Sequence, residues 1–157
     1  MEMVLMVGIP GSGKTTHARG ELPRHVLVSL DVIRQDARAR RLLINRYEAE
    51  VSPRDPSLSG GQRAEYVLAS DALRAGRDVV IDDTNVTRKR REVHIRLGKK
   101  HGARIRAVFF INYGHAMKRN RRRTGRELVP EDVMWEFMES LEPPFVGEGF
   151  DEISVYG

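Results

Sequence analysis

Short apolar runs recur along the chain, and the segments between them alternate apolar and polar residues with a helical period. A short continuous apolar run is typical of a strand that is buried on both faces of a parallel sheet. Such strands are predicted at Met3 to Val7, Val26 to Leu30, Asp78 to Ile81 and Arg104 to Ile111. Strands that alternate with helices predict an α/β fold, in which three α/β/α layers surround a central parallel sheet.

Capping residues mark the helices between these runs. One helix is predicted to begin near Lys14, and Gln62 to Ala75 is predicted to form another that a glycine terminates. A further helix, Arg88 to His101, follows Thr87, whose hydroxyl can accept a backbone N–H at the helix start. The last helix has Pro130 at its first position. Its apolar residues are predicted to share one face: Met134, Phe137, Met138 and Leu141.

Two segments lack a regular period. Ser52 to Gly61 is rich in proline, serine and glycine and is predicted to be a mobile loop. Lys118 to Arg126 is dense in arginine and is predicted to be a second mobile element, an arginine-rich lid. Because a charge run is usually a solvated face, the density of charge alone does not assign a function to this lid.

The length of 157 residues, without repeats or a linker, predicts one domain over residues 1–157. No apolar run approaches the ~20 residues that cross a bilayer, so we expect no membrane contact. The N-terminus carries no export signal, so we expect a cytoplasmic protein. The absence of cysteine excludes a disulfide scaffold, a thiolate metal site and a cysteine nucleophile.

Arginine dominates the basic residues, because 22 of the 27 are arginines, and the formal net charge is +5. A guanidinium binds phosphate in a bidentate manner, which suits a protein with polyanionic substrates. A general preference for arginine over lysine explains most of these residues equally well. Only the arginines that lie in motifs therefore indicate function.

A glycine-rich loop follows the first predicted strand. Gly8 to Thr15 reads GIPGSGKT and matches G-x-x-x-x-G-K-[ST] between a strand and a helix, the context that this motif requires. Its backbone N–H groups can surround the β-phosphate of ATP, Lys14 can contact the β- and γ-phosphates, and the Thr15 hydroxyl can ligate Mg²⁺. The sequence therefore predicts a P-loop NTPase fold that binds ATP and Mg²⁺. The predicted ATP contacts in this segment are Gly8, Pro10, Gly11, Ser12, Gly13, Lys14, Thr15 and Thr16.

Two carboxylates follow the apolar residues 79–81. Asp82 and Asp83 stand where a Walker B strand provides the acid that helps to hold the metal. Adjacent strand residues face opposite sides, so both can aim at one metal only if the strand has ended. We expect Thr15 and Asp82 at the metal, although the spacing leaves open which aspartate serves there and helix capping is an alternative for each. No Asn-Lys-x-Asp motif is present, which argues against a GTPase.

Asp31 and Arg34 follow the second apolar run, at the edge where open α/β folds bind their ligands. Their spacing of one helical turn puts a carboxylate and a guanidinium on one face. A kinase needs such a pair, because the carboxylate can accept the proton of a substrate hydroxyl beside a cation that holds the acceptor. The alternative is that Asp31 caps a helix and Arg34 is a solvated neighbour.

These motifs together resemble the kinase domain of the phage-type polynucleotide 5′-hydroxyl kinases, enzymes that prepare nucleic-acid ends for ligation. The similarity extends from Met3 to about Leu141. The pieces that carry it are GIPGSGKTTHAR at Gly8 to Arg19, SLDVIRQ at Ser29 to Gln35, IDDTN at Ile81 to Asn85 and KRNRRRTGRELVP at Lys118 to Pro130. The first piece is common to P-loop kinases, whereas the combination is more specific.

The resemblance implies transfer of the γ-phosphate of ATP to 5′-OH ends of DNA or RNA in nucleic-acid end repair. It implies that Asp31 is the general base, that Arg34 holds the acceptor, and that Arg123 reaches over the transferring phosphate. The implied catalytic residues are Lys14, Asp31, Arg34 and Arg123. The implied acceptor contacts are Asp31, Arg34, Asp83, Thr84 and Asn85, and the lid residues implied to contact ATP are Arg119 and Arg123.

The chain departs from the family pattern in its lid, which is one residue longer before Val129, so Arg122 or Arg126 can stand in for Arg123. Relatives that read Asp-x-Thr-Asn would place the supporting acid at Asp82 instead of Asp83. Because no phosphatase domain follows the kinase segment, we do not expect removal of a 3′-phosphate.

Two other hypotheses fit the same motifs. A small-molecule kinase that acts on a nucleotide, a sugar acid or a sugar nucleotide shares the P-loop, the aspartate and the arginine lid. A nucleotide-gated binding module would keep the P-loop but would not need Asp31 and Arg34. The preference for RNA or DNA, for single strands or nicks, the choice of nucleoside triphosphate and the oligomeric state stay open.

Overall fold

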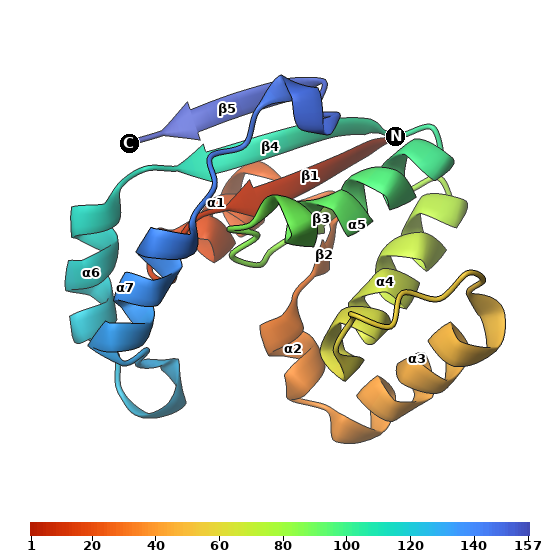
Figure 1. Ribbon diagram of the computed structural model, residues 1–157, viewed down its shortest axis with the longest axis horizontal. Coiled ribbons are helices and arrows are strands. Elements are labelled where there is room, and N and C mark those ends of the chain that lie inside the picture. The colour runs from red at the N-terminus through yellow and green to blue at the C-terminus, as the bar shows by residue number, and fades with distance from the viewer.

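A computed structural model describes all residues from 1 to 157 (Figure 1). The strands are β1 (Glu2–Val7), β2 (Val26–Val28), β3 (Val79–Ile81), β4 (Arg104–Phe110) and β5 (Glu152–Tyr156). The helices are α1 (Lys14–Glu21), α2 (Leu30–Arg34), α3 (Ala37–Glu50), α4 (Gly60–Arg74), α5 (Arg88–Lys100), α6 (Tyr113–Arg121) and α7 (Glu131–Ser140). Two short 3₁₀ turns are η1 (Gly125–Glu127) and η2 (Val146–Glu148).

The five strands form one sheet in the order β2-β3-β1-β4-β5, and every neighbouring pair is parallel. Leu5 of β1 lies opposite Ile81 of β3 and Ala107 of β4. Because all strands run the same way, their carboxyl ends meet at one edge, where open α/β sheets bind ligands. The predicted parallel α/β fold is confirmed, whereas β5 was not expected from the sequence.

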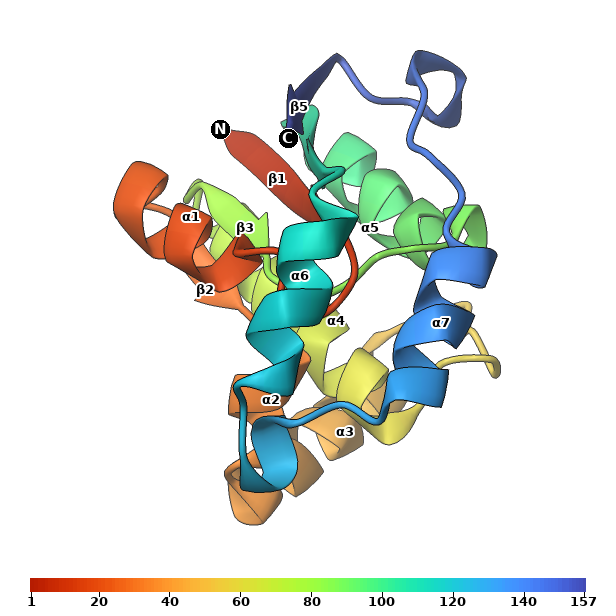
Figure 2. The same ribbon diagram turned by 90° about the vertical axis from the view of Figure 1, so that its left-hand side faces the viewer.

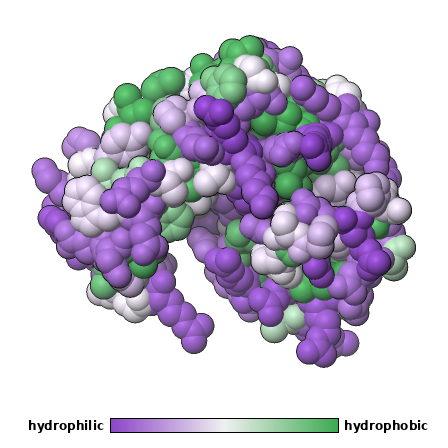
Figure 3. Space-filling model, viewed as in Figure 1, coloured by the Kyte–Doolittle hydropathy of each residue, from purple (hydrophilic) through white to green (hydrophobic).

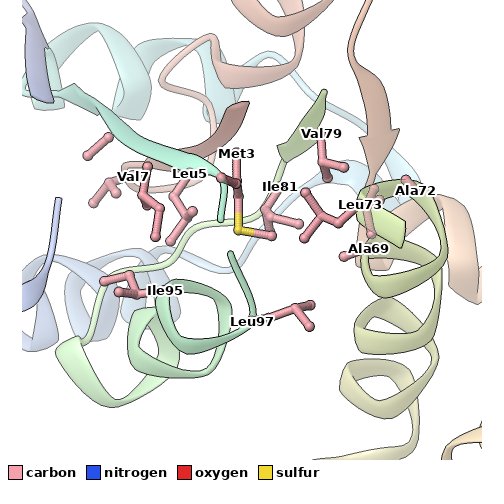
Figure 4. Close-up of a cluster of buried hydrophobic side chains, with 14 of the residues drawn as sticks. Met3, Leu5, Val7, Ala69, Ala72, Leu73, Val79, Ile81, Ile95 and Leu97 are labelled. Atoms are coloured by element: carbon pink, nitrogen blue, oxygen red, sulfur yellow. The ribbon is translucent and has the colours of Figure 1, made fainter. Parts of the chain in front are cut away.

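Side chains of β1 alternate between two apolar layers. Met3, Leu5 and Val7 join the larger core that α4 and α5 cover, as Figure 4 shows for the cluster around Leu73 and Ile95. Val4 and Met6 are buried on the opposite face, with Ala18 of α1, Leu22 at its C-cap, and residues of β3 and β4. All side chains of the central strand after Glu2 are therefore desolvated, which explains its continuous apolar run and confirms the three-layer arrangement.

Several predicted boundaries change for local reasons. The second strand ends at Val28, because Ser29 occupies the N-cap position of α2 and Leu30 belongs to that helix. The prediction that Pro130 is the first residue of the last helix was one position off, because Pro130 is its N-cap. Thr87 caps α5 as predicted, and its hydroxyl accepts a hydrogen bond from Arg90 N at 3.2 Å.

The arginine-rich lid is partly helical, which its irregular sequence pattern did not predict. Residues 118–121 complete α6, and the connection to α7 begins after them. The Asn120 side chain closes this connection, because it accepts from Val129 N at 3.0 Å and donates to the Val129 carbonyl at 2.6 Å. The predicted loop Ser52 to Gly61 ends earlier, because α4 begins at Gly60. Mobility of the lid and of residues 52–59 stays a prediction.

Two groups of helices lie on either side of the carboxyl edge of the sheet (Figures 1 and 2). Helices α6 and α7 with the lid form one side, and α2 and α3 form the other. The space-filling view in Figure 3 shows a cleft between these two sides, with hydrophilic residues along its walls. None of the helices is both long and apolar enough to cross a membrane.

Candidate active site

The phosphate loop connects β1 to α1 in a conformation that its glycines permit. Gly11 and Gly13 have φ values of +83° and +94°, which residues with a side chain rarely adopt. A Cβ at Gly11 would also lie 2.7 Å from the Ala116 carbonyl oxygen of α6. Gly8 N donates to the Thr84 carbonyl at 2.9 Å, which ties the loop to the segment after β3. The loop is thus held from both sides, as rigid binding of a phosphate requires.

Lys14 begins α1 and is buried within the loop. Its Nζ donates to the Ile9 carbonyl at 2.9 Å and to Ser12 Oγ at 3.4 Å. Burial lowers the pKa of Lys14 to about 8, against the opposing effect of the carboxylates of Asp82 and Asp83. The lysine is therefore a poorly solvated cation that a bound polyphosphate would stabilise.

Thr15 and Asp82 lie side by side between α1 and the end of β3. The Thr15 hydroxyl donates to Asp82 Oδ2 at 2.7 Å. The other oxygen of Asp82, Oδ1, is buried without a hydrogen-bond partner. Burial raises the pKa of Asp82, although the hydrogen bond from Thr15 and the charge of Lys14 oppose this effect. A hydroxyl beside an unsatisfied carboxylate oxygen fits a magnesium ion, which would neutralise charge on the β- and γ-phosphates when bound.

The second aspartate of this pair serves a different element. Asp83 Oδ1 accepts a hydrogen bond from Leu30 N at 3.0 Å, at the start of α2, and its Oδ2 lies 3.4 Å from Arg90 Nη2. Asp82 and Asp83 therefore diverge, although β3 ends at Ile81 and the alternation of strand residues no longer requires it. This geometry favours Asp82 at the metal and gives Asp83 a role in placing α2.

Asp31 and Arg34 project from α2 into solvent. The carboxylate of Asp31 is 91% exposed, the guanidinium of Arg34 is 60% exposed, and the two lie 3.9 Å apart. Ser29 occupies the N-cap of α2, so the alternative that Asp31 caps this helix is wrong. Asp31 directly follows Leu30, whose N–H is bonded to Asp83, and its charge has the smallest effect among the charges that shift the pKa of Lys14.

The lid arginines differ in their relation to the phosphate loop. Arg119 Nη1 donates to the Gly11 carbonyl at 3.2 Å. Arg123 is half-buried, and its positive charge lowers the pKa of Lys14. Arg122 and Arg126 are exposed. This arrangement favours Arg123 among the three candidates for the lid arginine.

The motif Asp83-Thr84-Asn85 does not act as one acceptor surface. Asn85 is buried, has a φ of +46° and donates from Nδ2 to the Met6 carbonyl at 2.8 Å. The implied acceptor contact of Asn85 is therefore corrected: its side chain joins the end of β3 to β1. Thr84 is half-buried and remains available. A cavity of about 420 Å³ opens beside it, lined also by Leu30 and Asp83.

Sequence reasoning missed a buried polar cluster behind Asp83. Glu65 of α4 and His94 of α5 are almost completely buried, and Arg90 contacts Glu65 as well as Asp83. A charged residue within the apolar pattern of α4 was the available signal, because Glu65 stands among alanines and apolar residues that face the core.

Comparison with known proteins identifies the family to which this chain belongs. The family model described as AAA domain (AAA_33) matches residues 3–144. The chain belongs to this family. The match includes the phosphate loop, both aspartates after β3, and the lid, so the P-loop that binds ATP lies wholly within the family domain.

Solved structures share the fold at low sequence identity. A gluconokinase from Sinorhizobium meliloti 1021 is 18% identical with a TM-score of 0.59, and the match covers 98% of this chain and 81% of that one. A sugar kinase from Janibacter sp. HTCC2649 is 17% identical with a TM-score of 0.62, covering 99% and 84%. Kti12 from Chaetomium thermophilum, in complex with ADP-AlF3, is 19% identical with a TM-score of 0.58, covering 99% and 88%. The P-loop NTPase fold is therefore shown over nearly the whole chain.

Proposed function

We propose that this protein is an ATP-dependent kinase that phosphorylates a hydroxyl group of a small anionic molecule. One observation carries the proposal: the exposed Asp31 carboxylate stands in the first turn of α2, directly after Leu30, whose N–H is bonded to Asp83 next to the Thr15–Asp82 pair. A base next to the site of the γ-phosphate can accept the proton of an acceptor hydroxyl, whereas a protein that only binds nucleotide needs no such base.

The residues suit direct transfer. Asp31 accepts the proton as the acceptor oxygen attacks the γ-phosphorus, the bond from this phosphorus to the β,γ-bridging oxygen breaks, and ADP leaves. Lys14 and Arg123 stabilise the charge on the transferring group, which is the main source of catalysis in phosphoryl transfer. Thr15 and Asp82 would hold Mg²⁺. Arg34, beside Asp31, would bind an anionic group of the acceptor.

Two observations support a small acceptor. The structures that share the fold over nearly the whole chain include a gluconokinase and a sugar kinase. The cavity of about 420 Å³ adjoins α2 through Leu30 and has the volume of a small-molecule site, although neither Asp31 nor Lys14 lines it. Its charged lining, which includes Lys89 and Arg96, suits a polar acceptor.

A second candidate is a polynucleotide 5′-hydroxyl kinase that acts on DNA or RNA ends. The specific observation in its favour is the set of motifs around Asp31, Asp83 and Arg119, which resembles that family as a combination. The exposure of Arg122 and Arg126 in the lid also suits a polyanion.

The deciding experiment incubates the protein with Mg²⁺ and γ-labelled ATP and offers two groups of acceptors. One group contains sugar acids, nucleosides, nucleotides and sugar nucleotides, and the other contains 5′-OH oligonucleotides of both sugar types. Label on a small molecule, with no gain from an oligonucleotide tail and with little effect of salt on the acceptor KM, supports the proposal. Label confined to oligonucleotides, with a KM that rises steeply with salt, would replace it with the second candidate. Failure to label any acceptor would remove the kinase assignment.

A further inference from the structure

A buried chain of polar contacts links two core helices to the helix that carries Asp31. Glu65 of α4 is fully buried and pairs with Arg90 of α5. Arg90 Nη2 also lies 3.4 Å from Asp83 Oδ2, and Asp83 Oδ1 accepts the hydrogen bond of 3.0 Å from Leu30 N. The side chain of Arg90 is only 15% exposed, so these charges interact with little screening by solvent.

We propose that Glu65 and Arg90 are positioning residues for phosphoryl transfer. They orient Asp83, Asp83 holds the first turn of α2 through Leu30 N, and α2 in turn places Asp31 at the phosphate loop. The inference rests on the proposed function, because it assigns these residues to the geometry of the same site. Glu65 contacts neither ATP nor the acceptor in this mechanism, whereas Arg90 also lines the cavity of about 420 Å³ beside Thr84.

Helix α2 depends on an anchor from outside itself. It comprises only residues 30–34, and helices of this length do not persist on their own. Its N-cap residue, Ser29, makes no side-chain capping hydrogen bond. The Asp83 carboxylate supplies the missing acceptor and places negative charge at the positive end of the helix. If this contact were lost, α2 and with it Asp31 would shift. Rates of phosphoryl transfer are sensitive to such small displacements of a catalytic group.

Arg90 is the cation that makes this anchor possible. Burial and the nearby charge of Asp83 raise the pKa of Glu65 well above its usual range, so the two acids cannot share this space as free carboxylates. His94, with Nε2 3.4 Å from Glu65 Oε1, does not compensate, because burial and the charge of Arg90 hold its pKa well below the usual value. Arg90 thus lies between the two acids, and its Nη2, 3.4 Å from Asp83 Oδ2, fixes the orientation of the carboxylate whose Oδ1 accepts from Leu30 N.

A pair of variants separates positioning from stability. Arg90→Met leaves Glu65 and Asp83 together without a cation, so we expect a lower melting temperature, faster hydrogen exchange at the Leu30 amide and a kcat lower by ~10-fold or more. The double variant Glu65→Gln/Arg90→Met removes the second acid and should recover most of the melting temperature. Asp83 still lacks its cation there, so amide exchange at Leu30 should stay fast and kcat should stay low. Affinity for ATP should remain within ~3-fold in both variants.

Two further variants complete the experiment. Arg90→Lys, which keeps the charge, should restore part of the Leu30 protection and of kcat. Glu148→Gln is the matched control, because Glu148 forms a buried pair with Arg91 of the same helix α5 but makes no contact with α2. We expect this control to lower the melting temperature while kcat and Leu30 exchange stay unchanged.

The inference is overturned if the double variant regains wild-type kcat and Leu30 protection together with stability, or if Leu30 exchange is the same in all variants. Failure of the proposed function gives a different result, because the wild-type protein itself would then phosphorylate no acceptor. Hydrogen exchange at Leu30 needs no acceptor and decides separately whether Arg90 anchors α2.

Discussion

The Thr15 hydroxyl donates a hydrogen bond of 2.7 Å to the Asp82 carboxylate, which joins the start of α1 to the end of β3. The two residues lie far apart in the sequence, and their side chains meet because β1 and β3 are neighbours in the sheet. Because Oδ1 of Asp82 has no hydrogen-bond partner, we propose this pair as the Mg²⁺ site.

Asp82→Asn should lower kcat by ~10²-fold or more and raise the Mg²⁺ concentration needed for half-maximal rate, because the amide keeps the shape but not the charge that attracts the metal. The measurement is the transfer rate as a function of Mg²⁺ concentration at saturating ATP. Asp71→Asn, which alters an ion pair between α3 and α4 away from the site, is the control. An unchanged Mg²⁺ dependence in Asp82→Asn would refute this metal site.

ATP affinity should depend on pH through Lys14. In the free protein burial lowers the pKa of Lys14 to about 8, and bound triphosphate favours its charged form and so raises this pKa. Binding then takes up a proton above pH 8, so affinity is fully present below that pH and decreases as the pH rises. Calorimetric titration between pH 7 and about 10 tests this, with Lys14→Met as the variant in which this pH dependence should disappear and ATP binding should weaken throughout.

Asp31→Asn should leave ATP affinity within a few-fold and lower the transfer rate by ~10²–10⁴-fold, because the amide cannot accept the proton of the acceptor hydroxyl. The side chain is exposed and Ser29 occupies the N-cap, so the melting temperature should not change. The test pairs nucleotide titration with the transfer rate at saturating ATP. Wild-type turnover in this variant would mean that Asp31 is not the base.

Among the lid arginines, Arg123→Ala should reduce kcat most, by ~10²–10³-fold, because its charge acts on the phosphoryl group in the transition state. Arg122→Ala and Arg126→Ala should have weaker effects, since both side chains are exposed. Arg123→Lys should rescue little, because the ammonium lacks the planar fork. If Arg122→Ala or Arg126→Ala lowers kcat more than Arg123→Ala does, that arginine, and not Arg123, is the one that contacts the transferring phosphate.

The sequence alone determined the features whose physics is local. The phosphate loop could be located from Gly8 to Thr15, because its glycines, lysine and threonine act within one turn between a strand and a helix. The buried strand β1 could be recognised as a continuous apolar run, because both of its faces are desolvated. The N-cap of α5 at Thr87 depends only on residues three positions apart.

The tertiary structure decided everything that depends on which elements meet. Asp82 and Asp83 are the same residue type at adjacent positions, and only the packing of β3 between β1 and β2 sends one to Thr15 and the other to Leu30. Asn85 has the same motif context as Thr84, yet it is buried against the Met6 carbonyl of β1. Charge in the sequence does not reveal whether a side chain meets water or another charge, because that difference is made by burial and by partners distant in the chain.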